Sequence, residues 1–464
     1  MTDKILKRTG EAVDFDALKI RAAMSKASKA SGENISDDML DGLTRQVVAA
    51  FPADKMISVE DIQDIVEEKL IEAGLSKTAK AYILYRAEHA KIRQTEADLM
   101  DIYKELTFKS AKDADMKREN ANIDADTAMG TMLKYGSEGA KYFVDNYILP
   151  KDVAAAHVSG DIHIHDKDFY MLTETCCQIN LLELFKNGFS TGHGYLREPN
   201  GIGSYSALAC IAIQANQNEM HGGQSIPIFD YCMAPGVAKT YRKEYLRALQ
   251  QYFIFHFGLK REEADRLVGQ VKAELSDSIK MVEPDDYLDK LCDLLKDCGI
   301  DKDGLKAANT NAAEQAMIET DKATYQAMEA FIHNLNTMNS RAGAQVPFSS
   351  INYGTDTSPE ARMVMKNLLL ATDAGLGNGE TPIFPVQIFK VKEGVNFNPG
   401  DPNYDLFKLA IKTSAKRLFP NFSFIDAPFN KMYYKDSDYN TEVAYMGCRT
   451  RVLGNNYDKS RQVT

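Results

Sequence analysis

The sequence predicts an α/β protein, in which helices wrap a mixed or parallel sheet or barrel and a small, mainly helical domain comes first. Two observations favour this class. Segments with helical patterning, such as 360–377, alternate with short apolar runs, such as 381–389. The first ninety or so residues carry turn and helix signals of their own. With 464 residues, the chain has room for several domains, or for one large domain with an appendage.

The composition is that of an ordinary globular protein, with 44% hydrophobic and 26% charged residues. A net charge of −11 argues against a general nucleic-acid binder, so we expect no DNA binding. The N-terminus lacks a signal-peptide core, and no run of about eighteen apolar residues predicts a membrane span. The seven cysteines form no CxxC pair and no zinc-type spacing, which favours a reducing cytoplasm and no metal ligands in this chain.

Residues 1–93 are expected to form the small domain. Strand-type residues at 5–6 and 13–15 flank a Thr9-Gly10 turn, which predicts a hairpin. Asp16 is placed to cap a helix over Ala17–Ala27, a second helix begins near Ser58, and a third runs from Lys77. A triphosphate site is one interpretation of this region, because a hairpin glycine, nearby cations and a helix N-terminus all favour phosphate binding. A solvated basic surface is the alternative explanation of the same residues.

Residues 94–130 are predicted to be a connector, since 110–130 is polar and poor in large apolar side chains. Residues 131–464 are predicted to form the α/β body. Helices are expected within 152–161, 205–218 and 360–377, and strands within 345–354 and 381–389. The acidic stretch 242–328 is expected to be helical and peripheral.

Several residues of the body are candidates for chemistry. His163 and His165 lie two apart, which places both on one face of an extended segment, as half of a metal site or as a hydrogen-bonded pair. Ser349 and Ser350 end the stretch 341–350, whose glycine and serine residues suit a phosphate cradle or a plain turn. Cys448, in the sequence AYMGCRT, is either a buried apolar thiol or the working atom of an enzyme.

The N-terminal segment resembles the ATP-cone, a regulatory domain that binds ATP or dATP, over LKRTGEAVDFDALKIRAAMSKA and again over 57–93. The resemblance implies regulation by nucleotide rather than catalysis. The residues that match its nucleotide site are Lys7, Arg8, Gly10, Val13, Phe15, Lys19 and Ile20, with Tyr82 and Arg86 as secondary candidates.

The body resembles the anaerobic, class III ribonucleoside-triphosphate reductases. The motifs that match, in order, are GDIHIHDKD, TETCCQINL, MHGGQSIP, RAGAQVPFSSINYG, AGLGNGETPIFPVQIF and AYMGCRT. The family implies a ten-stranded α/β barrel of the glycyl-radical enzyme type, here incomplete at the C-terminus. It also implies reduction of ribonucleoside triphosphates to deoxyribonucleoside triphosphates.

The resemblance implies a role for each matching residue. Cys448 would be the thiyl radical that removes the 3′ hydrogen of the ribose, and Cys176 the reductant opposite it, with Cys177 as the alternative. Met446 matches the subgroup in which formate is the electron donor. His163, His165 and Thr450 match positions at the substrate. The stretch 186–204 matches a dimer interface that binds a deoxynucleoside triphosphate effector, so we expect a homodimer or a higher oligomer.

The family carries a glycyl-radical loop and a four-cysteine zinc site after the radical cysteine, and a radical-SAM protein activates it. The sequence to Thr464 contains neither, so we expect the chain to be part of a longer protein. Two other readings stay open: a different glycyl-radical enzyme, such as an acyl or C–C lyase, and a nucleotide sensor with a degenerate reductase body.

Overall fold

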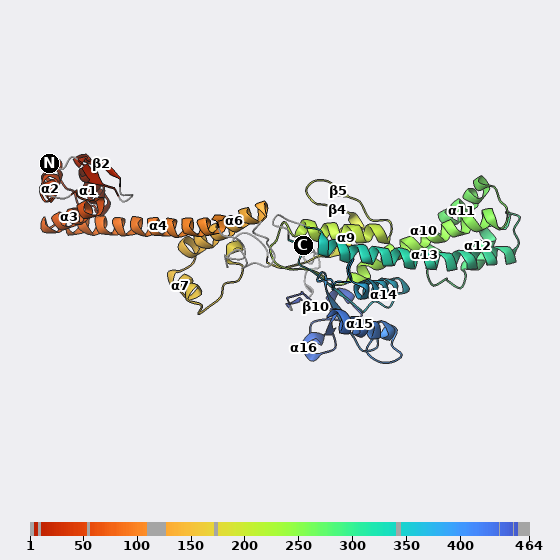
Figure 1. The fold of residues 1–464 in the computed structure, drawn as a ribbon. Coiled ribbons are helices and arrows are strands. Elements are labelled where there is room, and N and C mark those ends of the chain that lie inside the picture. The colour runs from red at the N-terminus through yellow and green to blue at the C-terminus, as the bar shows by residue number, and fades with distance from the viewer. Residues whose placement is uncertain are drawn as a thin grey trace. The chain divides into compact units, whose positions relative to one another are not determined.

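The structure is a computed structural model that describes residues 4–7, 11–52, 56–108, 127–170, 175–339, 345–435, 437–448 and 450–452, with the side chains of 91–98 outside it. The chain forms two compact units, 1–109 and 110–464. Figure 1 shows the helices and strands of both. The division falls inside the predicted connector.

The N-terminal unit begins with an antiparallel hairpin of β1 (Lys4–Leu6) and β2 (Ala12–Asp14), which confirms the predicted hairpin. Helix α1 (Ala17–Ser31) starts as predicted after Asp16, whose carboxylate accepts the Leu18 N–H at 3.0 Å, and it runs past the predicted end at Ala27. A side-chain cap of this kind satisfies an amide that has no partner within the helix.

Three further helices complete this unit. They are α2 (Asp37–Ala49), α3 (Val59–Glu72) and α4 (Ser76–Phe108). Helix α3 begins directly after Ser58, close to the predicted start, and Ser58 and Asp61 form a capping box there. The helices bury one apolar cluster that includes Met24, Val47, Val66 and Leu70. Helix α4 continues through residues 94–108 of the predicted connector.

The larger unit is built on a five-stranded sheet with the order β3-β6-β7-β8-β9, and every neighbouring pair is parallel. Its strands are β3 (Cys177–Gln178), β6 (Gln224–Ile226), β7 (Ser349–Tyr353), β8 (Val386–Val391) and β9 (Asn421–Phe424). The α/β class is therefore confirmed. The ten-stranded barrel stays a prediction, because the described residues form this open sheet.

Helices surround the sheet and connect its strands. They are α6 (Ala128–Phe143), α7 (Lys151–Ser159), α8 (Leu181–Asn187), α9 (Ile202–Asn216), α10 (Phe229–Phe255), α11 (Arg261–Leu275), α12 (Tyr287–Leu294), α13 (Lys302–Thr337), α14 (Pro359–Ala374), α15 (Tyr404–Arg417) and α16 (Pro428–Lys431). Short turns of other helix types are η1 (Val144–Ile148), η2 (Lys167–Phe169), η3 (Ser276–Ser278) and η4 (Tyr439–Thr441). Two hairpins are formed by β4 (Phe189–Ser190) with β5 (Tyr195–Leu196), and by β10 (Ala444–Tyr445) with β11 (Arg451–Val452). Helix α6 begins at Ala128, so the predicted linker does not extend to 130.

The two faces of the sheet differ in polarity. Side chains alternate between faces along each strand, and paired residues of parallel strands share a face. One face contributes Ile226, Ile351, Tyr353 and Phe389 to the main core, where helices α9, α10, α13 and α14 also pack. The opposite face carries mostly polar side chains, namely Gln178, Ser225, Ser350, Asn352, Lys390, Asn421 and Ser423, together with Val386 and Ile388.

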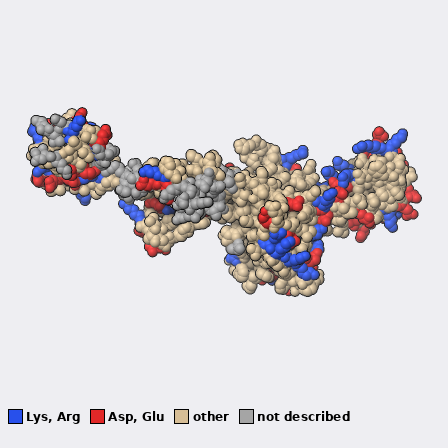
Figure 2. Space-filling view, in the orientation of Figure 1, with Lys and Arg blue, Asp and Glu red and all other residues tan. Residues whose placement is uncertain are grey.

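The acidic stretch predicted to be helical lies on α10 to α13. The distal parts of α10 and α13 pack with α11 and α12 around a second core that includes Tyr245, Phe253, Leu267 and Leu291. Figure 2 shows acidic and basic side chains intermixed on this distal part, whereas basic side chains gather over α15. The net charge of the whole chain conceals this local distribution.

Candidate functional site

The structure brings Cys176 and Cys448 together, although they lie at opposite ends of the larger unit's sequence. The two thiols lie close enough for Cys448 to raise the pKa of Cys176, and both residues are exposed. Cys448 also donates to the Thr450 hydroxyl, with Sγ and Oγ1 3.1 Å apart. Two thiols and a hydroxyl therefore share one small region.

Cys448 lies in the loop of the β10–β11 hairpin. The pairs Ala444–Val452 and Tyr445–Arg451 hold the two strands, and the Met446 N–H donates to the Thr450 carbonyl at 2.9 Å. Gly447 permits a close approach to the sheet, because an added Cβ would lie 3.1 Å from a methyl carbon of Val386. The glycine before the cysteine is thus explained by packing.

Asn352 anchors this hairpin to the polar face of the sheet. Its side-chain oxygen accepts the Tyr445 N–H at 2.8 Å, and its Nδ2 donates to the Tyr445 carbonyl at 2.9 Å. The Ser225 hydroxyl donates to the same carbonyl at 3.2 Å. One buried amide therefore satisfies both backbone groups of Tyr445, as a neighbouring strand would do.

The segment 442–448 crosses the sheet from its carboxyl edge to its amino edge. Glu442 accepts from the Thr355 hydroxyl just beyond the end of β7, at 2.7 Å. Tyr445 bonds within the strands, and Cys448 lies beside Cys176, which directly precedes β3. The position of Cys448 is thus set by contacts that follow the length of the strands.

The alternation of β3 separates the two neighbouring cysteines. Gln178 pairs with Ser225 on the polar face, so Cys176 belongs to that face and Cys177 to the opposite one. Cys177 is buried at 5% exposure, and its sulfur accepts from Asn216 Nδ2 at 2.8 Å. Only Cys176 is placed to meet Cys448.

Burial raises the pKa of the Cys176 thiol. A backbone hydrogen bond from Gly223 opposes this shift, while Cys448 and the negative charge of Asp166 add to it. The side chain therefore remains a protonated thiol at neutral pH, which is the form that holds a transferable hydrogen.

The predicted histidine pair is formed in the structure. His163 Nε2 lies 3.4 Å from His165 Nδ1, and both residues are exposed. His165 Nε2 lies 3.5 Å from Asp166, whose charge also acts on Cys176. Within the described residues, no group of three or more His, Cys, Asp and Glu side chains could hold a metal ion.

The other candidates of the body are more deeply placed. Met446 is only 2% exposed, so its side chain is buried although the residue directly follows β10. Ser349 and Ser350 are both buried, and their hydroxyls donate to the carbonyls of Pro347 and Gln224. In this structure the two serine hydroxyls bond inside the sheet rather than facing a ligand.

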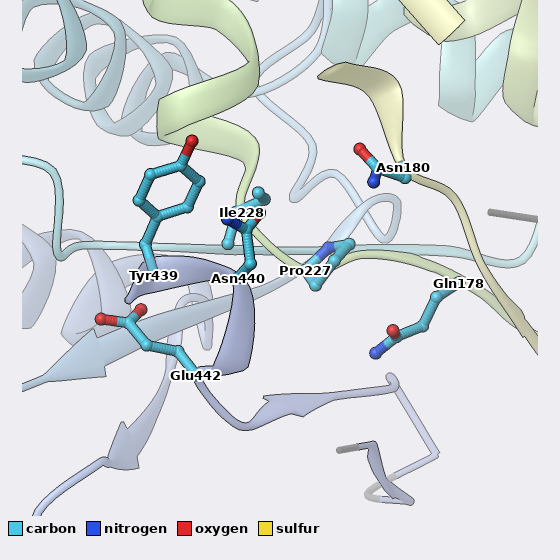
Figure 3. A pocket seen from close by; sticks show the side chains of 7 residues that line it. All are labelled: Gln178, Asn180, Pro227, Ile228, Tyr439, Asn440 and Glu442. Atoms are coloured by element: carbon cyan, nitrogen blue, oxygen red, sulfur yellow. The ribbon is translucent and has the colours of Figure 1, made fainter. Parts of the chain in front are cut away.

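A small hollow lies at the carboxyl edge of the sheet, away from the cysteine pair. Its volume is about 20 Å³, enough for one water molecule. Figure 3 shows η4 with Tyr439, Asn440 and Glu442 on one side of it, and Gln178 and Asn180 on the other. It is too small for a nucleotide.

In the N-terminal unit, Lys19 is exposed in the first turn of α1, and Lys7 Nζ lies 2.9 Å from Glu11. Ile20 and Tyr82 are buried, while Phe15 packs edge-on against Phe51. Val13 is half-buried on β2, and Arg8 and Gly10 lie outside the described residues.

Arg86 is engaged by acidic side chains. Its guanidinium contacts Glu60, Asp64 and Glu67, with 2.7 Å to Glu60 and 3.0 Å to Glu67. These carboxylates raise the pKa of Arg86 against the opposing effect of its partial burial. A phosphate would have to displace them, so this arrangement does not favour Arg86 as a nucleotide contact.

Sequence reasoning missed the residues that hold the site together. Asn352 and Ser225 are ordinary strand residues, and nothing in the sequence pairs them with Tyr445. Glu442 forms a buried ion pair with Lys390 across the edge of the sheet, at 3.1 Å. The sequence does contain one signal of a close contact near Cys176. The adjacent glycines of the HGG tripeptide at 221–223 are typical of a place where two backbone segments approach closely.

No helix in the described ranges has the length and apolarity needed to cross a membrane. Comparison with known proteins gives two family matches. The model for anaerobic ribonucleoside-triphosphate reductase matches residues 119–463, and the model for the ATP cone domain matches residues 3–91.

Curated relatives match most of the chain. Anaerobic ribonucleoside-triphosphate reductases from Salmonella typhimurium and Escherichia coli are each 27% identical over 91% of this chain and 51% of their own length. The enzyme of enterobacteria phage T4 is 28% identical over 72% of this chain and 46% of its own length. The chain thus spans about half the length of these relatives. With three quarters of its residues inside one family match and an ATP cone before it, the chain belongs to the anaerobic ribonucleoside-triphosphate reductase family.

Proposed function

We propose that this chain provides the thiol site and the nucleotide-sensing domain for anaerobic reduction of ribonucleoside triphosphates to deoxyribonucleoside triphosphates. The observation that supports this most directly is the pairing of Cys176 with Cys448. A single exposed thiol would have many explanations. Two thiols brought together on the polar face of a parallel sheet, one of them on a dedicated hairpin, suit chemistry that passes hydrogen between sulfur and a ligand.

Loss of a ribose 2′-hydroxyl requires transient removal of the 3′ hydrogen, which acid–base residues do not achieve. A thiyl radical on Cys448 would take that hydrogen, forming S–H and leaving a carbon radical at C3′. The same hydrogen would return at the end of the cycle. Thiol and ribose C–H bonds have comparable strengths, so the transfer is nearly balanced in both directions.

Cys176 would act as the second thiol, since it is protonated at neutral pH and adjoins Cys448. Thr450 donates or accepts hydrogen bonds next to Cys448, and the exposed imidazoles of His163 and His165 would bind the sugar or phosphates. Buried Met446 would hold the hairpin loop in position. Formate would supply the electrons, because this chain pairs one reducing cysteine with this methionine.

The relatives extend well beyond the part that this chain covers. We assign the glycyl radical that would generate the Cys448 radical, and a structural zinc, to that remaining part. A radical-SAM activating protein would be needed to form the glycyl radical. The segment 186–204, which spans the β4–β5 hairpin and the start of α9, would form a homodimer interface and bind the deoxynucleoside triphosphate effector.

The proposed function predicts a strict requirement for formate. The complete protein, activated without oxygen by its radical-SAM partner, is expected to convert CTP to dCTP only when formate is present. Product is measured by chromatography with and without formate. Turnover supported equally by a dithiol alone would contradict the assignment of formate. A bare nucleotide sensor would bind ATP or dATP at the N-terminal unit but would bind no ribonucleoside triphosphate at the larger unit.

The N-terminal unit predicts a separate effect on regulation. Lys19→Ala is expected to weaken ATP and dATP binding about tenfold, because it removes one charge beside the α1 N-terminus, where phosphate is favoured. Binding is measured by calorimetry on the full chain. Lys29→Ala is the control, since Lys29 is exposed in the last turn of the same helix. Equal losses in both variants would place the nucleotide elsewhere.

A further inference from the structure

The turn at His221-Gly222-Gly223, directly before β6, lies against Cys176. A Cβ added to Gly222 would be 1.6 Å from the Thr175 carbonyl oxygen and 2.9 Å from the Cys176 sulfur. The Gly223 carbonyl accepts the Cys177 N–H at 3.2 Å, and its backbone also hydrogen-bonds to the Cys176 thiol. The backbone of this turn therefore packs directly against Cys176 and limits where its sulfur can lie.

The His221 side chain fastens this turn to a different segment. Its side chain is 5% exposed, and its ring stacks on Phe169 with 4.7 Å between centroids and 5° between planes. Its Nε2 lies 3.4 Å from Asp166 Oδ2. Asp166 has the left-handed value φ 48°, an uncommon conformation for a residue other than glycine.

Asp166 connects the two halves of the site. The same Oδ2 atom lies 3.5 Å from His165 Nε2 and 3.4 Å from His221 Nε2. One carboxylate thus links the exposed histidine pair to the turn beneath Cys176. Backbone strain at such a residue persists only where surrounding contacts hold it.

We propose that His221 is a positioning residue for Cys176, which holds the 221–223 turn in place through its contact with Asp166. This inference rests on the proposed function, in which Cys176 is the second thiol. The substrate class is that of the proposed function, a ribonucleoside triphosphate. The contact between His221 and Asp166 adds no chemical step to the reaction. It sets where the Cys176 sulfur lies relative to Cys448.

The contact also has an electrostatic consequence. Among the described residues, Cys448 and Asp166 act on the charge of Cys176, and His165 and His221 contact Asp166. The charge of Asp166 raises the pKa of Cys176. Loss of the imidazole would leave this carboxylate less well compensated, and the pKa of Cys176 would rise further.

The test uses the full chain and needs no turnover. A diazene oxidant that takes up both thiol hydrogens converts Cys176 and Cys448 to a disulfide, and peptide mass spectrometry measures its rate. His221→Phe retains a ring on Phe169 but loses Nε2, and it is expected to slow the disulfide about tenfold. His221→Gln keeps an N–H donor toward Asp166, and is expected to stay near the wild-type rate.

The pH profile of Cys176 alkylation separates positioning from general stability. His221→Phe is expected to move it to higher pH, and Asp166→Asn to lower pH, while alkylation of the remote Cys298 in the same sample stays unchanged. His256→Phe, the same change at an exposed histidine directly after α10 and outside the proposed sites, is the control. A wild-type rate and profile in His221→Phe would overturn the proposal. Faster alkylation of Cys298 would reveal that His221→Phe is unfolded. In that case, an unshifted pH profile of Cys176 alkylation in Asp166→Asn would overturn the proposal.

The outcome is distinguishable from a failure of the proposed function. If thiol reactivity responds as expected but the complete, activated protein makes no deoxynucleotide, the positioning role stands and the reductase assignment fails. If deoxynucleotide forms but His221→Phe changes neither the rate of disulfide formation nor the pH profile of Cys176 alkylation, the reductase assignment stands and the positioning role fails.

Discussion

Cys448→Ala is expected to reduce deoxynucleotide formation by the complete, activated protein to background, with ATP binding at the N-terminal unit unchanged. Alanine has no S–H bond, so nothing at this position could take the 3′ hydrogen and return it. The residue is exposed on the hairpin loop, so loss of its sulfur leaves no buried cavity. Product formation from CTP and calorimetric ATP binding are measured on the same preparation.

Other cysteines of the chain are matched controls for this substitution. Cys298→Ala changes a partly buried cysteine outside the site and is expected to keep full activity. Cys176→Ala is expected to abolish product, whereas Cys177→Ala, on the opposite face of the sheet, should retain it. A Cys448→Ala protein that still made deoxynucleotide would exclude Cys448 as the hydrogen-abstracting atom.

Lys390→Met is expected to lower the free energy of unfolding of the larger unit by about 3–5 kcal/mol, because it leaves buried carboxylates without their cation. The Lys390 and Glu442 side chains are 1% and 4% exposed, with Nζ and Oε2 3.1 Å apart. A second carboxylate, that of Asp230, is also buried and accepts the backbone N–H groups of 354–356. Urea unfolding is followed by far-ultraviolet circular dichroism, since the chain has no tryptophan.

The effect of Lys390→Met should depend on pH. Burial raises the pKa of Asp230 to about 6, and the charge of Lys390 opposes this shift. A carboxyl whose pKa is raised by folding stabilises the folded state at low pH, and this contribution is lost as pH rises through the folded pKa. Without Lys390 the pKa of Asp230 would be higher still. The stability loss should therefore be larger at about pH 8 than at about pH 5.

Lys416→Met is the control for this prediction. Lys416 pairs with Asp373 at 3.0 Å, but its side chain is 53% exposed, so its removal should change stability little. Equal losses in the two variants would show that the buried pair has no special role. Because Glu442 begins the segment that leads to Cys448, Lys390→Met should also slow the Cys176–Cys448 disulfide.

Local features of the chain were predictable from the sequence for local reasons. Asp16 and Ser58 start helices because a side chain and an amide two or three residues apart satisfy each other. The hairpin of β1 and β2 follows from strand residues on both sides of a short turn. Strand β7 lies within the predicted range 345–354, and β8 begins within the predicted range 381–389 and ends two residues beyond it.

The sequence could not reveal the non-local contacts that hold the site. Asn352 stands in for a neighbouring strand at Tyr445, and Lys390 meets Glu442 across the edge of the sheet; both pairings depend on topology. The sequence also could not show that Arg86 is paired. In the structure three carboxylates of α3 surround its guanidinium, and this arrangement depends on how α3 packs against α4. Burial likewise placed the hydroxyls of Ser349 and Ser350 inside the sheet.

The amino-acid sequence alone was enough to predict the family, the ATP cone and Cys448, because these depend on which residues occur and in what order. The choice between the adjacent residues Cys176 and Cys177 required the fold, since it follows from the pairing of β3 with β6. The fold also decided how Cys448 is held, because the hairpin is anchored by side chains from β6, β7 and β8. Contacts between residues far apart in the chain arise only when the fold has formed.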